Sequence, residues 1–157
     1  MGDPRWPGPE YRIEVTFRAP LRFVYRWCTD YRRDDAAREG EKYTRRVVER
    51  TKGRVVFEDI EPDEAGWFWT RHVVRLIPPY RWHMDGWGNR RHVTADYRLA
   101  PVGKNRTRLE LRWRRRPSLL KFTRIPKSVG ERSSRLGWAN FRRELERDYR
   151  RSRTHRR

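Results

Sequence analysis

The chain has 157 residues, a length typical of one domain with a single core, and a formal net charge of +19. Its single cysteine excludes an internal disulfide, and no Cys/His spacing suited to zinc is present. No stretch approaches the roughly 20 apolar residues of a membrane span, and the first residues lack the apolar core of a secretion signal. We therefore expect a cytoplasmic protein with no transmembrane segment, no metal and no cofactor.

The basic character at first favours a polyanionic partner, such as nucleic acid or an anionic membrane. Only five of the 40 basic residues are lysine, however, and such a skew toward arginine can reflect genome-wide base composition. We therefore expect a basic, solvated surface that makes weak and non-specific polyanion contacts at most. The oligomeric state stays open.

The first elements of the chain are an irregular arm, a strand and a short helix. Residues 1–10 hold three prolines and two glycines, which disfavour regular structure. Apolar and polar side chains alternate over 11–18, the pattern of a half-buried strand. Pro20 suits a helical first turn, and apolar residues at helical spacing follow it, so a helix is expected over about 20–30.

Three aspartates, Asp30, Asp34 and Asp35, lie at the end of this helix and in the segment 33–39, which predicts another turn or two of helix. A carboxylate cluster for metal binding or acid–base chemistry is one interpretation. Aspartates beside short helices more often cap or solvate them, so capping or solvation is the prediction.

Residues 42–115 predict six strands joined by connections of a few residues. Short connections in unbroken order make an antiparallel sheet the expected arrangement. Gly53, in the first connection, is available for a positive φ. A two-residue turn at 88–89 would place Trp82 opposite Ala95.

Alternation gives this sheet two chemically different faces. A buried aromatic side chain contributes roughly 1.5–3 kcal/mol, against about 0–1 kcal/mol for an exposed charge pair, so the apolar face is the one expected to be covered. Trp67 and Trp69 do not fit the alternation and are expected at a rim or edge. The inward positions on the last four strands are Phe68, Thr70, His72, Val74, Leu76, Tyr80, Trp82, Met84, Val93, Ala95, Tyr97, Leu99, Thr107, Leu109, Leu111 and Trp113. The outward positions of the last strand are Arg106, Arg108, Glu110, Arg112 and Arg114.

The last third of the chain predicts one long helix over about 131–151. Trp138, Phe141 and Leu145 are three and four residues apart, which gathers them on one face of that helix. The sheet is the only surface available to cover this face. A basic tail, 152–157, would follow the helix.

This order of elements resembles the START-like SRPBCC superfamily, in its polyketide cyclase/dehydrase and lipid-transport branch. The phrase FRAPLRFVYRWCTDY is similar to the strand-to-helix opening of that branch, and PPYRWHMDGWG to its central hairpin. The resemblance implies an α+β helix-grip fold: a curved antiparallel sheet of about seven strands wrapped around a long C-terminal helix, with short helices between strands 1 and 2. Residues 11–151 would form a single START-like ligand-binding domain, with a cavity for a lipid, sterol, polyketide or other apolar molecule. No catalytic motif of the family carries over to this sequence.

The candidate ligand-binding residues are those expected between sheet and helix, and plain core packing is the alternative for each. Tyrosine hydroxyls and indole N–H groups are the polar groups that would orient a ligand's oxygen. His72 is the one catalytic candidate, because imidazole exchanges a proton near neutral pH; its alternative role is a core histidine bonded to backbone or water. The ten candidates are Phe68, His72, Tyr80, Trp82, Met84, Tyr97, Leu111, Trp113, Trp138 and Phe141.

Three functional hypotheses are compatible with these features. The first is a binding or carrier protein for a small hydrophobic ligand, such as a lipid, a polyketide or an aromatic molecule. The second is an enzyme of the cyclase, aromatase or dehydratase type that works without a metal, with His72 and a cavity tyrosine as proton carriers. The third is non-specific polyanion binding through the arginine-rich surface and residues 142–157, which hold eight arginines and three acidic residues. The third is weakened because the aromatic residues that would stack on bases are expected to face inward.

Overall fold

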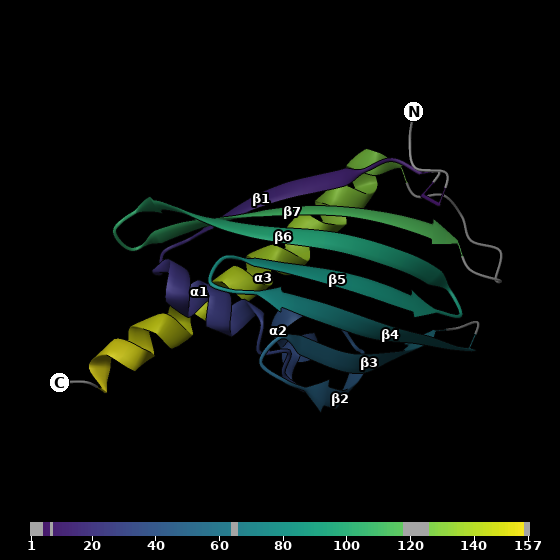
Figure 1. Cartoon of the computed structure of the whole chain (residues 1–157), viewed down its shortest axis with the longest axis horizontal. Helices are drawn as coiled ribbons and strands as arrows, with labels where there is room; N and C mark the ends of the chain where they lie inside the picture. The colour runs from purple at the N-terminus through teal and green to yellow at the C-terminus, as the bar shows by residue number, and fades with distance from the viewer. Residues whose placement is uncertain (1–4, 7, 64–65, 118–125, 156–157) are drawn as a thin grey trace.

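The structure, a computed structural model, describes residues 5–6, 8–63, 66–117 and 126–155. Seven strands form one antiparallel sheet in the order β1-β7-β6-β5-β4-β3-β2, and the long helix α3 crosses one face of it (Figure 1). This arrangement confirms the predicted α+β helix-grip fold. No helix in the described ranges is long and apolar enough to cross a membrane. The elements are β1 (Tyr11–Phe17), α1 (Leu21–Cys28), α2 (Asp35–Glu39), β2 (Thr44–Arg50), β3 (Arg54–Asp63), β4 (Gly66–Ile77), β5 (Arg81–Gly88), β6 (Arg91–Gly103), β7 (Arg106–Pro117) and α3 (Lys127–Thr154).

Helix α3 is longer than predicted at both ends. It begins four residues earlier because Pro126 occupies the N-cap, where a residue without a backbone N–H breaks no helical hydrogen bond. It continues to Thr154, and its last turns extend past the sheet (Figure 1). The connector before it, 118–125, lies outside the described residues.

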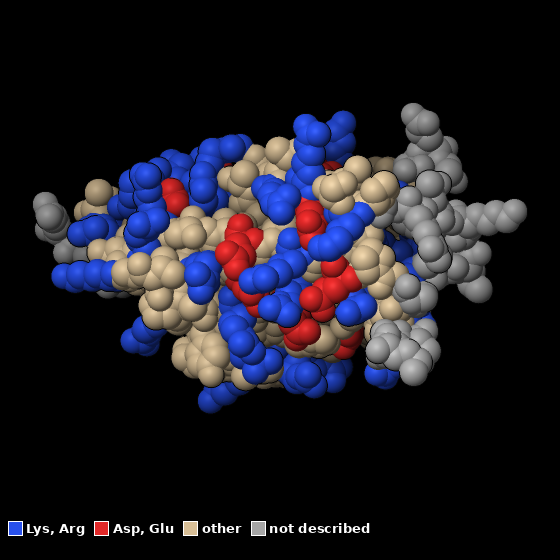
Figure 2. Space-filling view, turned by 90° about the horizontal axis from the view of Figure 1, so that it is seen from above, with Lys and Arg blue, Asp and Glu red and all other residues tan. Residues whose placement is uncertain are grey.

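The predicted division of the sheet into an apolar and a charged face is confirmed. Trp82, Ala95 and Leu109 of the inner face are at most 2% exposed. On the convex face, Arg12 contacts Glu110 at 2.5 Å and Arg112 contacts the same carboxylate at 2.9 Å. Figure 2 shows acidic and basic side chains side by side on the upper surface of the molecule. The charges of the convex face are therefore interleaved, as expected for a solvated surface.

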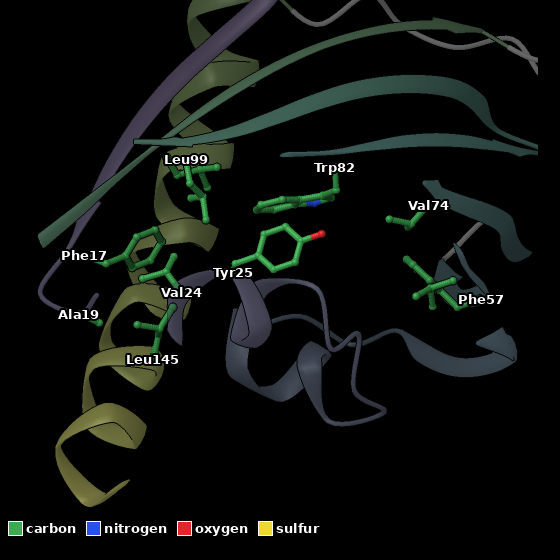
Figure 3. Close-up of a cluster of buried hydrophobic side chains, with 11 residues drawn as sticks. Phe17, Ala19, Val24, Tyr25, Phe57, Val74, Trp82, Leu99 and Leu145 are labelled. Atoms are coloured by element: carbon green, nitrogen blue, oxygen red, sulfur yellow. The ribbon is translucent and has the colours of Figure 1, made fainter. Parts of the chain in front are cut away.

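The hydrophobic core joins the sheet to α1 and α3. Leu145 of α3 and Val24 of α1 are fully buried and lie in one cluster with Phe17 (Figure 3). Tyr25 of α1 meets Trp82 edge to face, with ring centroids 5.8 Å apart. Burial of these large apolar groups is the main force that holds the helices against the sheet.

The predicted pairing of β5 with β6 is wrong by two residues. Trp82 lies opposite Tyr97 rather than Ala95, because the turn is formed by 89–90 and not by 88–89. Gly88 stays in β5, where a Cβ would lie 1.7 Å from the carbonyl oxygen of Trp69. That glycine therefore allows close approach of two strands rather than a turn, and a shift of two residues leaves each side chain on its predicted face.

The connection between β2 and β3 also differs in detail. Gly53 was the expected site of positive φ, but the glycines with positive φ in the described ranges are Gly40, Gly66 and Gly103. The turn is closed instead by the Thr51 N–H, which donates to the Arg54 carbonyl at 2.8 Å. This closure needs no left-handed residue.

Candidate functional site

An inner cavity of about 160 Å³ lies between the concave face of the sheet, the α1–α2 segment and α3. One half of its wall is aromatic and the other half is ionic. Its lining residues are Trp27, Cys28, Tyr31, Asp35, Glu39, Tyr43, Arg45, Phe57, His72, Trp82, Met84, Tyr97, Trp138 and Phe141.

The aromatic half is a chain of ring contacts that runs from the sheet to α3. Trp82 and Tyr97, which are cross-strand neighbours, stack with centroids 4.7 Å apart and planes 9° apart. Tyr97 contacts Trp138 of α3 at 6.3 Å, and Trp138 contacts Phe141 at 5.4 Å. Offset and edge-on contacts of this kind hold rings in fixed positions, so this wall is preformed.

Arg45 of β2 is the centre of the ionic half. Its Nε and Nη2 donate to the two carboxylate oxygens of Asp59 at 2.8 and 2.9 Å, and its Nη1 lies 2.5 Å from Asp35 Oδ2. The guanidinium also lies 4.1 Å from the ring centroid of Phe57. Only 8% of the Arg45 side chain is exposed. Two parallel hydrogen bonds and a ring contact fix this charge in place.

Strand pairing explains why the arginine and its partner face inward. Arg45 lies directly opposite Asp59 in the antiparallel pair of β2 and β3. Asp59 is two residues from Phe57, which is 1% exposed, and alternate residues of a strand share a face. The fold therefore buries this ion pair together with the apolar side chains of β3.

Helix α2 brings two carboxyl groups, Asp35 and Glu39, to the cavity from positions one helical turn apart. The helix ends at Gly40, whose φ of 84° is a left-handed conformation that favours glycine. Asn140 of α3 donates from Nδ2 to the Glu39 carbonyl oxygen at 2.7 Å, which ties α2 to α3. The Tyr43 hydroxyl donates to the Glu39 carboxylate at 3.0 Å.

Burial raises the pKa values of the cavity carboxyl groups. It raises the pKa of Glu39 to about 7, although the Tyr43 hydrogen bond acts in the opposite direction. It also raises the pKa of Asp35 to about 6, against the attraction of Arg45. For Arg45, burial acts to lower the pKa, but the hydrogen bonds and charge of Asp59 outweigh it and the pKa lies above its ordinary value. Near neutral pH the cavity thus combines a fixed positive charge with carboxyl groups that exchange protons.

His72 faces the cavity, as predicted, and packs against Phe57 with ring centroids 4.6 Å apart. Its Nε2 lies 3.6 Å from Asp59 Oδ2, and its Nδ1 has no hydrogen-bond partner among the described residues. His72 is thus not bonded through Nδ1 to the backbone of any described residue, and the alternative of a core histidine bonded to water stays a prediction. Burial, followed by the positive charge of Arg45, lowers the pKa of His72 to about 3, so the ring is neutral at pH 7.

Six of the ten predicted candidates lie in the cavity wall, and the fold brings them together from β4, β5, β6 and α3. These six are His72, Trp82, Met84, Tyr97, Trp138 and Phe141.

The other four candidates lie elsewhere. Leu111 and Trp113 face inward but away from the cavity, where Leu111 packs with Ile13 and Trp113 stacks on Tyr11. Phe68 lies near the start of β4. The guanidinium of Arg90 packs over its ring, 4.4 Å from the ring centroid. The predicted inward position of Tyr80 is wrong: it is 47% exposed, because the turn between β4 and β5 includes it and the alternation resumes only at residue 81.

Asp30 and Asp34, near the short helices, are solvated as predicted, with about half of each side chain exposed. Asp34 occupies the N-cap of α2 but makes no side-chain capping hydrogen bond, and instead pairs with Arg38 at 3.0 Å. Asp30 pairs with Arg32 at 2.7 Å. Asp35 points to the cavity. In the part of the chain that the structure describes, no three of the His, Cys, Asp and Glu side chains are grouped as metal ligands would be.

The ionic half is not singled out by the sequence pattern. One available signal is that Asp59 shares its strand parity with Val55 and Phe57, which indicates an inward carboxylate in need of a partner. A second signal is the spacing of Asp35 and Glu39, four residues apart beside the sheet's first strands. Neither signal identifies Arg45, since arginine occurs on both faces of the sheet.

Comparisons with known proteins find similar structures but no matching sequence family. No protein-family model and no curated protein matches the chain. The Zhui aromatase/cyclase from Streptomyces sp. R1128 superposes with a TM-score of 0.74 at 17% identity, over 88% of this chain and 94% of that one. A START superfamily protein from Mycobacterium smegmatis gives a TM-score of 0.66 at 10% identity, over 92% and 99% of the two chains. The di-domain ARO/CYC StfQ from the steffimycin biosynthetic pathway gives 0.65 at 12% identity, over 87% of this chain and 45% of that one. The chain therefore adopts the START-like helix-grip fold that these structures share.

Proposed function

We propose that the protein binds a small neutral aromatic compound carrying a hydroxyl group in the inner cavity. The observation that carries the proposal is the two-sided wall, with stacked rings on one side and the carboxyl groups of Asp35 and Glu39 on the other. Rings bind rings through large apolar area, and a few polar groups fix the orientation of a ligand. The fold supports this proposal, because aromatase/cyclases are among the proteins of similar structure.

The size of the cavity restricts the ligand to about one ring. Its volume of about 160 Å³ is close to that of a cavity that holds benzene, roughly 150 Å³, and below the roughly 300–1,000 Å³ of drug-sized sites. A lipid, a sterol or a polyketide chain is larger than this space.

The charge of the cavity selects against anionic ligands. Arg45 is already bonded to Asp59 and Asp35, and Glu39 is a further acid in the same wall. A carboxylate entering this space would be repelled by these acids, because the positive charge of Arg45 is already bonded to two of them. A phenolic hydroxyl can instead donate to Glu39, which is partly ionised at pH 7 because its pKa is about 7.

The test compares phenol, toluene and benzoate by isothermal titration calorimetry at pH 7.5. We expect phenol to bind most tightly, toluene more weakly and benzoate not measurably. Glu39→Gln removes the charged acceptor and should weaken the binding of phenol by about tenfold or more, since a hydrogen bond to a charged group contributes about 1.5–3 kcal/mol. The affinity for toluene should stay unchanged. Glu49→Gln, which removes an exposed carboxylate paired with Arg54, is the matched control. Equal binding of benzoate and phenol, or no binding of any of the three, would contradict the proposal.

A second candidate function is acid–base catalysis of the dehydratase or cyclase type, and one observation favours it. Glu39 and Asp35 share the cavity with pKa values of about 7 and 6, so one can donate and the other accept a proton near neutral pH. In a dehydration, one carboxylate would take the proton next to a ketone while the other protonates the departing hydroxyl, releasing water. His72 is less suited to this role, because a pKa of about 3 makes it a weak base.

The enzyme hypothesis is tested with 4-hydroxy-2-butanone, a β-hydroxyketone small enough for the cavity. Turnover would appear as the ultraviolet absorbance of the conjugated enone. Glu39→Gln should reduce the rate by about 10²–10⁴, whereas Glu49→Gln, at an exposed ion pair with Arg54, should not change it. A rate no higher than that of buffer would leave binding as the function and dismiss catalysis on this substrate class.

A further inference from the structure

A second hollow lies outside the inner cavity, beside the last turns of α3. It is an open groove of about 770 Å³, bounded by α1, the turn between β2 and β3, the end of β4 and the C-terminal part of α3. This volume falls within the range of small-molecule sites. Its lining residues are Phe23, Arg26, Trp27, Thr29, Asp30, Arg32, Arg38, Arg50, Thr51, Leu76, Asp148, Arg151, Ser152 and His155.

The groove contains more arginine than its own carboxylates neutralise. Asp148 accepts hydrogen bonds from the Trp27 indole N–H at 2.9 Å and from Arg38 at 3.0 Å. Asp30 is paired with Arg32 at 2.7 Å. Both acids are therefore occupied by partners within the groove.

Three arginines of the groove form no ion pair with any carboxylate in the described ranges: Arg26, Arg50 and Arg151. They come from three different elements, namely α1, the end of β2 and the last turns of α3. Arg50 donates a hydrogen bond to the backbone carbonyl of Asp30, which orients its guanidinium beside the groove. The ends of α1 and α3 contribute at most about half a negative charge each, so the three arginines leave the groove positive.

This arrangement differs from that of the arginines on the convex face. There, Arg12 and Arg112 are paired with Glu110, and exposed pairs of this kind are common on solvated surfaces. In the groove, three arginines without acidic partners in the described ranges line one concave space. Like charges around one space repel each other, and an anion in the groove would relieve that repulsion.

Part of the groove lining is apolar. Phe23, Trp27 and Leu76 contribute to it, and Phe23 is fixed by a ring contact with Tyr149 of α3 at 5.0 Å. A lining that combines apolar side chains with three guanidinium groups matches a molecule with an apolar body and one anionic group. A nucleic acid backbone carries many phosphates along a track, and one compact groove matches a single anionic group better.

We propose that this groove is a second ligand site, which binds a small organic anion with an aromatic or acyl body. The body would rest on Phe23, Trp27 and Leu76, and a carboxylate, sulfonate or phosphate group would be held by Arg26, Arg50 and Arg151. The site is separate from the inner cavity, although Trp27 lines both spaces. Its ligand is anionic, whereas the cavity ligand proposed above is neutral.

The probe for this site is 1-naphthalenesulfonate, whose two fused rings are larger than the inner cavity. In calorimetric titrations at low salt we expect one molecule to bind per chain, with 1-naphthol, its neutral relative, bound at least tenfold more weakly. The double variant Arg26→Gln/Arg151→Gln should bind the sulfonate at least tenfold more weakly, because guanidinium groups form strong bidentate hydrogen bonds with such anions. Arg98→Gln with Arg108→Gln, on exposed positions of the convex face, is the control and should change nothing.

Three results would overturn the proposal. The first is equal binding of the sulfonate to the groove double variant and to the convex-face double variant. The second is displacement of the sulfonate by phenol, which would place both ligands in the inner cavity. The third is the absence of sulfonate binding together with sedimentation on phosphatidylglycerol vesicles that depends on Arg26 and Arg151, because the partner would then be a membrane surface rather than a free molecule.

Discussion

The inner cavity and the convex face each contain a small network of ion pairs centred on one residue. In the cavity, Arg45 lies between two carboxylates, Asp35 and Asp59. On the convex face, Glu110 lies between two arginines at 2.5 and 2.9 Å. Both networks pair guanidinium groups with carboxylates at similar distances, so they differ chiefly in their contact with water.

That difference reverses the direction of the pKa shifts. The hydrogen bond from Arg112 lowers the pKa of Glu110, as an arginine beside an exposed carboxylate is expected to do. In the cavity, burial raises the pKa values of Asp35 and Asp59 even though Arg45 is equally close. Desolvation therefore outweighs the ion pair inside the fold, and only the inner network can exchange protons near neutral pH.

Removal of the central charge should give the largest contrast between the networks. Arg45→Met leaves two buried carboxylates without their cation, and we expect the free energy of unfolding to fall by about 3–5 kcal/mol. Arg12→Met, which removes one arginine of the convex-face network, should change it by about 1 kcal/mol or less. Urea unfolding monitored by circular dichroism measures both values. A similar loss for the two variants would show that burial does not distinguish the networks.

The pH dependence of stability should also separate the two networks. The pKa of Glu39 rises from 4.5 to about 7 on folding, so the folded state holds this proton more tightly than the unfolded state. The stability that Glu39 contributes is complete below about pH 4.5 and is lost as the pH rises through 7. His72 acts in the opposite direction between about pH 3 and 6.5, because its pKa is lowered on folding.

A comparison of variants isolates the contribution of Glu39. Between pH 4.5 and 7.5, the free energy of unfolding of Glu39→Gln should fall less with rising pH than that of the parent protein. Glu110→Gln should keep the parental slope over the same range, because the pKa of Glu110 is shifted downward. Urea titrations at half-unit pH intervals provide the measurement. Identical slopes for all three proteins would mean that Glu39 is not held in its protonated form by the fold.

The smallest expected effect concerns the convex face alone. Glu110→Gln should reduce the free energy of unfolding by less than about 1 kcal/mol, since exposed ion pairs contribute little. The loss should shrink further when salt is raised from 0.01 to 1 M, values at which the screening length falls from roughly 30 to 3 Å. A loss above 2 kcal/mol that persists in high salt would indicate that this network is structural.

Alternation along the strands was sufficient to predict which side of the sheet is covered. Trp82, Leu109 and Leu111 are buried as the two-residue period requires, because a slip by one position would expose every apolar group. The register of β5 against β6 was harder to predict, because it depends on whether residues 88–89 or 89–90 form the turn. Asn89 settles that choice through hydrogen bonds with the backbone of Trp67 and Trp69, contacts between residues about twenty positions apart.

The candidate site was only half accessible from the sequence. Its aromatic half follows from the same alternation that gives the core, and His72 was found in this way. Its ionic half depends on Arg45 meeting Asp59 from the next strand and Asp35 from α2. Charged residues also occupy the solvent-exposed face of strands. These three residues are therefore identified as a site only by their contacts in the folded structure.

Cys28 gives the inner cavity a built-in chemical reporter. It is the chain's single cysteine and lies in the cavity wall. Burial raises the pKa of its thiol, so little reactive thiolate forms at neutral pH while the fold is closed. A small thiol reagent should therefore react slowly with this partly exposed side chain, and a ligand that fills the cavity should slow the reaction further.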